Sequence, residues 1–396
     1  MTPRRFPAPP RGDIAESCDP RDGTRAAAHE ILGSHWNEAG FTVPHAGRYP
    51  HLWLWDSCFH AIVWSALGEP ERAIAELRTA LGAQAEDGFV PHITYVGSNE
   101  DASFWGRPST SSVTQPPMYG HAIAELLRSG VAVPPDLVVR ATTGLDFLLR
   151  RRQRIDGLVA VVHPWETGAD DSPRWDHWWG ESATPAAKWT VKGAMVRTIT
   201  RSFDGSPLAN RGFVAAPASF NALVAFNAFE LADVTGDDAL AARALQLAEV
   251  LDERWDPELG TWVDAGDAAR GSGRIRTADA LFPLLVTVRP DVDARVAAAL
   301  SDPTGFYGSC GIAGVHRTES TFDPRAYWRG SAWPQVWYVL WIAARRLGLD
   351  ALAELVRGAT VRGAVRSGFA EHWDPDDASP LGARPQSWST LAAVMR

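Results

Sequence analysis

This 396-residue chain has only three cysteines, fewer basic residues (38) than acidic ones (47), and no long apolar run. Its cysteines, Cys18, Cys58 and Cys310, show neither metal-ligand spacing nor a disulfide framework. No apolar run approaches the ~18 residues that a membrane span requires, and prolines and arginines interrupt any signal-peptide core near the N-terminus. These absences predict a cytoplasmic protein with no membrane attachment.

The charge balance and the missing motifs exclude further classes of function. A net charge of −9 and a pI of about 5.7 argue against non-specific nucleic-acid binding, which needs a basic surface. The sequence contains no Gly-x-Gly-x-x-Gly after a strand, no Walker loop and no Gly-x-Ser-x-Gly elbow. Its histidines have no spacing typical of zinc sites. We therefore expect no cofactor and no catalytic metal, and a homo-oligomer is compatible with the sequence.

Tryptophan, by contrast, is abundant: the chain has 18 Trp against 6 Tyr and 15 Phe. An isolated tryptophan is usually a core residue, but these gather in clusters beside carboxylates and arginines. Flat indole faces suit the C–H faces of a sugar ring, so the clusters predict the wall of a carbohydrate pocket. The clusters are Trp53, Trp55 and Trp64; Trp165, Trp175, Trp178 and Trp179; Trp328, Trp333, Trp337 and Trp341; and Trp373 and Trp388.

Helical periodicity dominates the chain, and β-branched alternating runs such as Leu158–Val162 are few and short. Loops that carry Gly, Trp and carboxylates recur between the helices, which predicts an all-α (α/α)6 toroid with long loops forming the active-site mouth. We expect a flexible N-terminal arm over 1–23, one catalytic domain over 24–396 and a lid loop over 178–212. The predicted helices are Thr24–Trp36, Asp56–Ala66, Pro70–Gln84, Met118–Ser129, Asp136–Arg152, Ser219–Val234, Asp238–Trp255, Asp291–Leu300, Ser331–Leu347 and Asp350–Gly363.

The segment His163–Asp176 concentrates carboxylates between indoles. Pro164 and Pro173 argue against one uninterrupted helix, so the segment is interpreted as a loop. A dry, aromatic setting raises the pKa of a carboxylic acid enough for it to deliver a proton near neutral pH. The alternative is a solvated acidic loop with an N-cap or a surface ion pair.

Two shorter motifs carry polar groups next to aromatic residues or prolines. Asp56 follows Trp55 where a loop should turn into a helix, so it either caps that helix or accepts sugar hydroxyls. Gln115 precedes a proline and is held extended, and its amide can both donate and accept hydrogen bonds. A Pro-Pro helix entry alone explains most of the Gln115 motif.

Two later motifs add an arginine and a carboxylate. Arg329 follows Trp328 and either contacts a sugar or forms a buried ion pair, and Glu371 is flanked by His372 and Trp373. The chain thus has a carboxylate at 170 or 171 and another at 371, each set among tryptophans. Glycoside hydrolysis needs two carboxyl groups, one protonated and one ionised.

The order of these motifs resembles glycoside hydrolase family 63, and within it the bacterial mannosylglycerate and glucosylglycerate hydrolases. The resemblance covers residues 25–396 and implies an (α/α)6 barrel and inversion at an α-linked sugar without a catalytic metal. The motifs are Trp53-Leu-Trp-Asp56, Gln115-Pro-Pro117, Glu166-Thr-Gly-Ala-Asp-Asp-Ser-Pro-Arg-Trp-Asp176, Tyr327-Trp-Arg-Gly330 with Trp333-Pro334, and Glu371 with Ser387-Trp-Ser389.

Carried over by this resemblance, Asp170 is the general acid and Glu371 the general base. Asp171 stands where the family usually has Asn; if ionised it would raise the pKa of Asp170, and it is also a rival for the role of acid. We expect the two carboxyl groups to lie ~6.5–9.5 Å apart, the inverting geometry. The substrate-binding candidates are Tyr49, Trp53, Trp55, Asp56, Gln115, Trp165, Glu166, Arg174, Trp175, Trp328, Arg329, Gly330, Trp333, His372, Trp373 and Trp388.

The sequence therefore predicts an inverting, exo-acting α-glycoside hydrolase that releases glucose or mannose from a small α-glycoside such as glucosylglycerate or mannosylglycerate. The alternatives are a trehalase or oligosaccharide α-glucosidase, an epimerase or polysaccharide lyase on the same toroid, and a non-catalytic carbohydrate-binding protein. A glycerate aglycone needs a positive or donor-rich subsite. The candidates for it are Arg48, Arg107, Arg211, His372 and Gln386.

Overall fold

The structure is a computed structural model that describes residues 20–97, 102–180, 182–269, 273–287 and 289–396. The arm predicted for residues 1–23 lies mostly outside the described residues. The first described helix, α1 (Pro20–Ser34), begins before the predicted start at Thr24.

Helices make up most of the described chain, as the sequence predicts, and every predicted helix has an observed counterpart. The predicted helix Asp136–Arg152 ends in a π-helical turn, η1 (Phe147–Arg151). The helices α4, α7 and α8 and the 3-10 helices η6 and η7 were not predicted. The other helices are α2 (Leu54–Leu67), α3 (Pro70–Gly82), α4 (Ala102–Trp105), α5 (Tyr119–Arg128), α6 (Pro135–Asp146), α7 (Asp176–Trp179), α8 (Pro185–Arg197), α9 (Ala218–Thr235), α10 (Asp238–Asp252), η6 (Asp279–Leu285), α11 (Pro290–Ser301), α12 (Pro334–Arg346), α13 (Asp350–Ser367) and η7 (Ser387–Ala393).

The strands are short and pair as two-stranded antiparallel ribbons in the loops. The predicted strand Leu158–Val162 forms β6, and Val161 bridges to Ala215. The pairs are β1 (Trp36–Asn37) with β2 (Phe41–Thr42), β3 (Leu52–Trp53) with β4 (Ile93–Thr94), β5 (Arg154–Ile155) with β6 (Leu158–Val159), β7 (Ile199–Arg201) with β8 (Pro207–Asn210), β9 (Ala215–Ala216) with β12 (Ala265–Gly266), β10 (Trp255–Asp256) with β11 (Thr261–Trp262), β13 (Tyr307–Gly308) with β14 (Gly311–Ile312), and β15 (His372–Trp373) with β16 (Pro380–Leu381).

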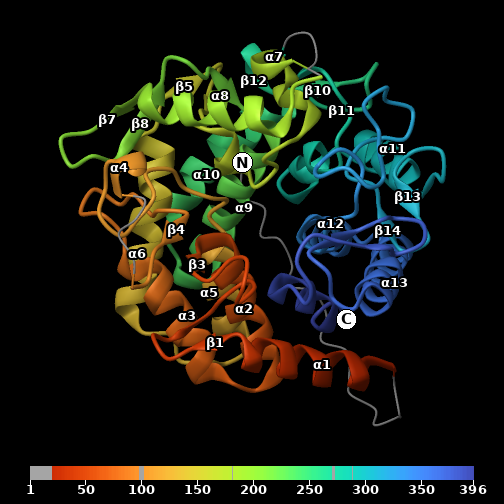
Figure 1. Ribbon diagram of the computed structural model, residues 1–396, viewed down its shortest axis with the longest axis horizontal. Helices are drawn as coiled ribbons and strands as arrows, with labels where there is room; N and C mark the ends of the chain where they lie inside the picture. The colour runs from red at the N-terminus through yellow and green to blue at the C-terminus, as the bar shows by residue number, and fades with distance from the viewer. Residues whose placement is uncertain (1–19, 98–101, 181, 270–272, 288) are drawn as a thin grey trace.

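The helical elements form a closed ring of neighbours. Elements α2, α5, α9, η6, α12 and η7 contact one another in this order, and η7 contacts α2 again. A second layer packs outside them: α1 on η7, α3 on α2, α6 on α5, α10 on α9 and α13 on α12. In Figure 1 the colour follows this order around the molecule, from red α1 through yellow-green α8 to blue α13. The arrangement is consistent with the predicted toroid.

Burial distinguishes the two layers. Helix α9 is buried on nearly all sides, whereas α10 buries a single stripe of Leu240, Ala244, Leu247, Ala248 and Leu251. A helix that is apolar all round belongs inside a fold, and one with a single apolar stripe belongs on its surface. The stripe on α10 is the one that the sequence predicts, and Asp237 caps the helix by accepting from the Leu240 amide at 2.9 Å.

The segment predicted as a lid loop is more regular than expected. Helix α8 and the β7–β8 ribbon occupy most of residues 178–212. Pro185 at the first turn and the Thr184 hydroxyl, which accepts from the Ala187 amide at 3.2 Å, start α8. The loop prediction is therefore wrong for this segment, and its role as a lid stays a prediction.

One contiguous apolar core runs through the described chain from Ala28 to Met395. The division into one domain over 24–396 stays a prediction. A smaller cluster around Trp105 and Val162 lies beside it. None of the described helices is both long and apolar enough to cross a membrane.

Candidate active site

The loop that carries Asp170 lies directly on the indole of Trp55. Gly168 ends the 3-10 turn η2 (Pro164–Thr167) at φ +73°, and a Cβ there would lie 1.9 Å from Trp55 Cζ3. Only glycine permits this approach and this backbone conformation together. Trp175 Nε1 donates to the Ala169 carbonyl at 2.8 Å. The residue before Asp170 is thus held from one side by an indole N–H, and the glycine before it is packed against an indole face.

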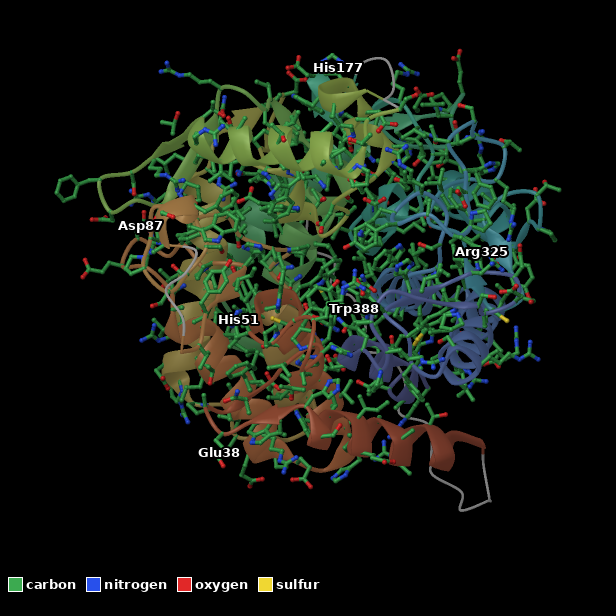
Figure 2. All side chains as sticks on the ribbon, in the orientation of Figure 1. Glu38, His51, Asp87, His177, Arg325 and Trp388 are labelled. Carbon is green, nitrogen blue, oxygen red and sulfur yellow. The ribbon has the colours of Figure 1, made fainter. Side chains whose placement is uncertain are left out.

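Glu371 is anchored from several sides immediately before β15. The Ala383 amide donates to its Oε2 at 2.8 Å and the Tyr49 hydroxyl donates to its Oε1 at 3.0 Å. Trp388 Nε1 donates to the backbone carbonyl of Glu371 at 2.9 Å. A Cβ on Gly382 would lie 2.4 Å from Oε2, so that neighbour too must be glycine. Figure 2 shows Trp388 near the centre of the view, whereas Glu38 and His177 lie at the periphery.

The two carboxyl groups share an electrostatic environment. The Tyr327 hydroxyl lies 3.5 Å from Asp170 Oδ2, and charges on both Asp170 and Glu371 raise the pKa of Tyr327 after burial does. Burial, then Asp171 and Glu371, raise the pKa of Asp170 to about 7 against the opposing charge of Lys192. Asp170 and Glu371 therefore face a common space, although they are separated by 201 positions of sequence (371 − 170).

The two carboxyl groups differ in the hydrogen-bond donors that reach them. Burial also raises the pKa of Glu371, but the Ala383 amide, the Tyr49 hydroxyl and Arg48 all stabilise its ionised form. The donor that reaches Asp170, the Tyr327 hydroxyl, stands at the long distance of 3.5 Å. Asp170 therefore has fewer donors to stabilise its ionised form than Glu371 has.

An aromatic wall adjoins this pair. Trp328 and Trp333 stack with ring centroids 3.9 Å apart and an interplanar angle of 5°, and His372 stacks on Trp333 at 4.4 Å. Tyr327 and Trp388 meet Trp333 edge-on at 5.1 and 5.9 Å. Burial lowers the pKa of His372 to about 3, so its ring is neutral. Trp333 is 1% exposed and is stacked between Trp328 and His372, so this cluster is a packed aromatic wall and neither face of Trp333 is open.

A second set of predicted residues lies below the Asp170 loop. Gln115 Oε1 accepts from the Trp55 backbone amide at 3.0 Å. Asp56 does not cap α2, whose N-cap is Trp53, so the capping alternative is wrong. Among the described residues no hydrogen-bond partner reaches Asp56 Oδ1, although Asp56 is only 2% exposed. Burial raises the pKa of Asp56 to about 7. An unpartnered buried carboxyl oxygen is a costly feature that a bound hydroxyl would relieve.

Two residues predicted to contact the sugar, Glu166 and Arg174, use their charged groups in contacts within the protein. Glu166 forms a bidentate pair with Arg152 at 2.6 and 3.0 Å and accepts from two backbone amides. Arg174 directs its donors to Asp264 and Asp279, together with neighbouring hydroxyls. These side chains hold loops in place and leave no charged group free for a sugar.

The remaining predicted residues also make contacts within the protein. Trp373 Nε1 donates to the Cys310 carbonyl at 2.7 Å. Arg329 forms a bidentate pair with Asp176, the buried ion pair weighed as its alternative, with one distance of 2.9 Å. Gly330 lies against the Asp323 carbonyl, Trp165 packs among His92, His163 and Trp105, and Trp53 meets Tyr49 edge-on at 5.8 Å.

Sequence reasoning missed three residues at this site. Tyr327 belonged to a quoted motif but was not singled out, and its hydroxyl reaches Asp170. Lys188 and Lys192 contact Asp171 from α8. Their i, i+4 spacing was the available signal, but nothing in the sequence pointed it toward residue 171.

One trio among the described residues has spacing compatible with a metal ion: His121, Glu125 and Glu230. It lies on α5 and α9. Glu230 already pairs there with Arg128 and Arg346, the latter at 2.8 Å. Because the guanidinium groups supply the positive charge, this cluster is a structural ion network.

Comparison with known proteins agrees with this geometry. A family model described as the mannosylglycerate hydrolase MGH1-like glycoside hydrolase domain matches residues 49–389. The chain is 28% identical over 417 residues to a mannosylglycerate hydrolase of Thermus thermophilus, covering 93% of this chain and 99% of the relative. It is also 28% identical over 437 residues to a glucosylglycerate hydrolase of Mycolicibacterium hassiacum, covering 94% and 97%.

A solved structure extends the similarity to the fold. The crystal structure of the GH63 mannosylglycerate hydrolase from Thermus thermophilus in complex with Tris and D-glycerate superposes with a TM-score of 0.84 at 26% identity, covering 94% of this chain and 99% of that one. The chain therefore belongs to the MGH1-like glycoside hydrolases of family 63, as its motifs predict.

Proposed function

We propose that the protein is an inverting, exo-acting α-glycoside hydrolase built on an (α/α)6 toroid. The observation that carries the proposal is that Asp170, whose pKa burial raises to about 7, and Glu371, anchored by the Ala383 amide and the Tyr49 hydroxyl, lie beside a common tyrosine, Tyr327. A non-catalytic carbohydrate-binding protein has no need for two carboxyl groups in such different hydrogen-bonding environments around one space.

The mechanism uses both groups in one displacement. Asp170 gives its proton to the glycosidic oxygen as the bond to the anomeric carbon breaks. Glu371 takes a proton from a water molecule, whose oxygen attacks the anomeric carbon from the opposite face. The sugar leaves with inverted configuration, and the enzyme is reset when Asp170 regains a proton and Glu371 loses one to solvent.

The sugar that is cleaved sits between the aromatic wall and the floor formed by Asp56 and Gln115. The unpartnered Oδ1 of Asp56 accepts a sugar hydroxyl, and the Gln115 amide donates to another, because its carbonyl oxygen is already used by Trp55. Trp55 and Gly168 position the acid above this floor.

An acidic aglycone suits the outer part of the site. Arg48 is 57% exposed, and its Nη1 lies 4.0 Å from Glu371 Oε2. A carboxylate there would gain a cation that the base only partly engages. Arg107 instead donates to Thr110 and the Asp204 carbonyl. Because relatives hydrolyse mannosylglycerate and glucosylglycerate, we propose a small α-glycoside of this class as the substrate.

The deciding experiment follows a substrate panel by proton NMR. The panel contains α-glucosylglycerate, α-mannosylglycerate, trehalose and a nigerose-type disaccharide. We expect hydrolysis of a glycerate glycoside with the β-anomer of the sugar appearing first. Initial release of the α-anomer would establish a retaining mechanism, and turnover of trehalose alone would move the protein to the trehalase class. A product that contains no oxygen from labelled water would assign it to the lyases or epimerases.

A further inference from the structure

Two lysines of helix α8 contact Asp171, the residue that follows the proposed acid Asp170. Lys188 and Lys192 lie one turn apart on α8 and contact different oxygens of Asp171: Lys188 Nζ is 2.8 Å from Oδ2 and Lys192 Nζ is 3.0 Å from Oδ1. The side chains of Asp171, Lys188 and Lys192 are 21%, 11% and 9% exposed. Because these side chains are little exposed, solvent screens their ion pairs less, and the pairs are stronger than an exposed surface ion pair.

Helix α8 is tied to the same loop at two further points. His163, which opens the acid-bearing segment, bonds through Nε2 to the Lys192 carbonyl at 3.1 Å. Its Nδ1 accepts from the Trp165 amide, which leaves Nε2 as the donor. Lys192 Nζ also lies 5.1 Å from the centroid of the Trp179 ring. Backbone, carboxylate and aromatic contacts therefore join α8 to both ends of the segment around Asp170.

We propose that Lys188, Lys192 and Asp171 form a positioning clamp for the catalytic acid, through which α8 fixes the place and the charge environment of Asp170. The clamp rests on the proposed function, because it assumes that Asp170 delivers the proton. It also removes Asp171 from competition for that role. Both of its oxygens accept from ammonium groups, which hold it ionised, so it has no proton to give.

The charges around Asp170 give the clamp a measurable signature. The groups that face Asp170 are Lys192 from α8, Asp171 from its own loop, Glu371 from the base loop, and the hydroxyls of Tyr327 and Tyr49. Burial raises the pKa of Asp170 most, Lys192 lowers it and Asp171 raises it. Lys192 and Asp171 thus act with opposite signs on one proton. An uncharged residue at 171 would leave two ammonium groups uncompensated beside the acid.

The test compares Asp171→Asn and Lys192→Met in the full-length protein. Because the acid must be protonated, its pKa sets the basic limb of the pH profile of kcat/KM. Asp171→Asn should move this limb to lower pH and Lys192→Met to higher pH, each by about one unit. Lys188→Met removes an ammonium from the same carboxylate but should move the limb less, since Lys192 dominates the effect on Asp170. Lys192→Arg should restore the limb.

A second readout does not depend on turnover. The carbon-13 carboxyl resonance of Asp170, identified by its loss in Asp170→Asn, should titrate with the same opposite shifts in the two variants. If both variants keep the wild-type titration and basic limb, and differ only in thermal stability, the clamp is a structural contact and the proposal is wrong. If the NMR titration shifts as stated but no glycoside is hydrolysed, the clamp stands and the proposed function fails.

Discussion

The Tyr49 hydroxyl donates to Glu371 Oε1 at 3.0 Å, a hydrogen bond between residues 322 positions apart. It joins the loop before α2 to the loop after α13, and it lowers the pKa of a carboxyl group that burial raises. The pKa of Glu371, the proposed base, is therefore lowered by a residue from the opposite end of the chain.

Removing this hydroxyl should shift the acidic limb of the activity profile. The base must be ionised, so a higher pKa of Glu371 costs activity at low pH. We expect Tyr49→Phe to move the acidic limb of kcat/KM upward by about one unit. The matched control is Tyr95→Phe, which removes a hydroxyl that accepts from Trp105 at 2.7 Å, outside the site. An unchanged limb in Tyr49→Phe would show that the hydroxyl does not stabilise the carboxylate.

The acid and the base should respond differently to the leaving group. Asp170→Asn and Glu371→Gln are each expected to lower kcat on a glycerate glycoside by about 10²–10⁴-fold with the circular dichroism spectrum unchanged. With a nitrophenyl α-glycoside, whose leaving group needs no proton, Asp170→Asn should recover most of its activity and Glu371→Gln should not. Equal losses on both substrates would contradict the assigned roles.

The close approach of Gly168 to Trp55 can be separated from its backbone conformation. Gly168 and Gly236 both have φ +73°, but a Cβ meets Trp55 at 1.9 Å in the first case and nothing within 4 Å in the second. Gly236→Ala should cost about 1–2 kcal/mol of unfolding free energy, the penalty of the left-handed conformation, and leave kcat intact. Gly168→Ala should cost more and also lower kcat. Equal costs in urea denaturation would mean that the loop yields to the clash.

The buried carboxyl of Asp56 should make stability depend on pH. Its pKa rises from 3.8 unfolded to about 7 folded, so the folded state binds the extra proton between these values. Stability is then lost as pH rises above about 4, and the loss is complete above about 7. Asp56→Asn should stabilise the protein at pH 8.5 by up to about 4 kcal/mol and have little effect at pH 4, while weakening substrate binding. A constant difference in Tm at both pH values would contradict this account.

The helices were predictable where burial and apolar periodicity coincide, as on α10. Helix α8 escaped prediction because its buried residues are Lys188, Lys192, Met195 and Val196. Because lysines occupy inward positions of α8, the helix has no apolar stripe that the sequence could show. The ion pairs of these lysines with Asp171 are seen only in the folded structure. The 3-10 elements η6 and η7 are too short for a helical period to register, although they complete the inner ring.

The acid and base positions were carried over from the family resemblance and stay predictions, whereas the partners of several neighbouring charged residues were not predicted. Arg174 stands in the acid-bearing segment like a sugar ligand, yet its partners Asp264 and Asp279 lie 90 and 105 positions away. Glu166 similarly pairs with Arg152, which lies on the other side of the β5–β6 ribbon in sequence. A sequence shows that such charges exist but does not show which opposite charge each one meets in the folded chain.

The contact of η7 with α1, α2 and α12 has a consequence for the order of assembly. During synthesis the helical pairs can form in turn as they emerge, but the inner layer keeps an open seam until η7 docks. Trp388, which holds the Glu371 carbonyl, lies within η7. Docking of η7 therefore closes the inner layer and also brings Trp388 to the backbone of Glu371, the proposed base. A chain truncated before Ser387 would keep most of its helices but lack η7, and we expect it to have no hydrolytic activity. Incompletely synthesised chains would then be inactive.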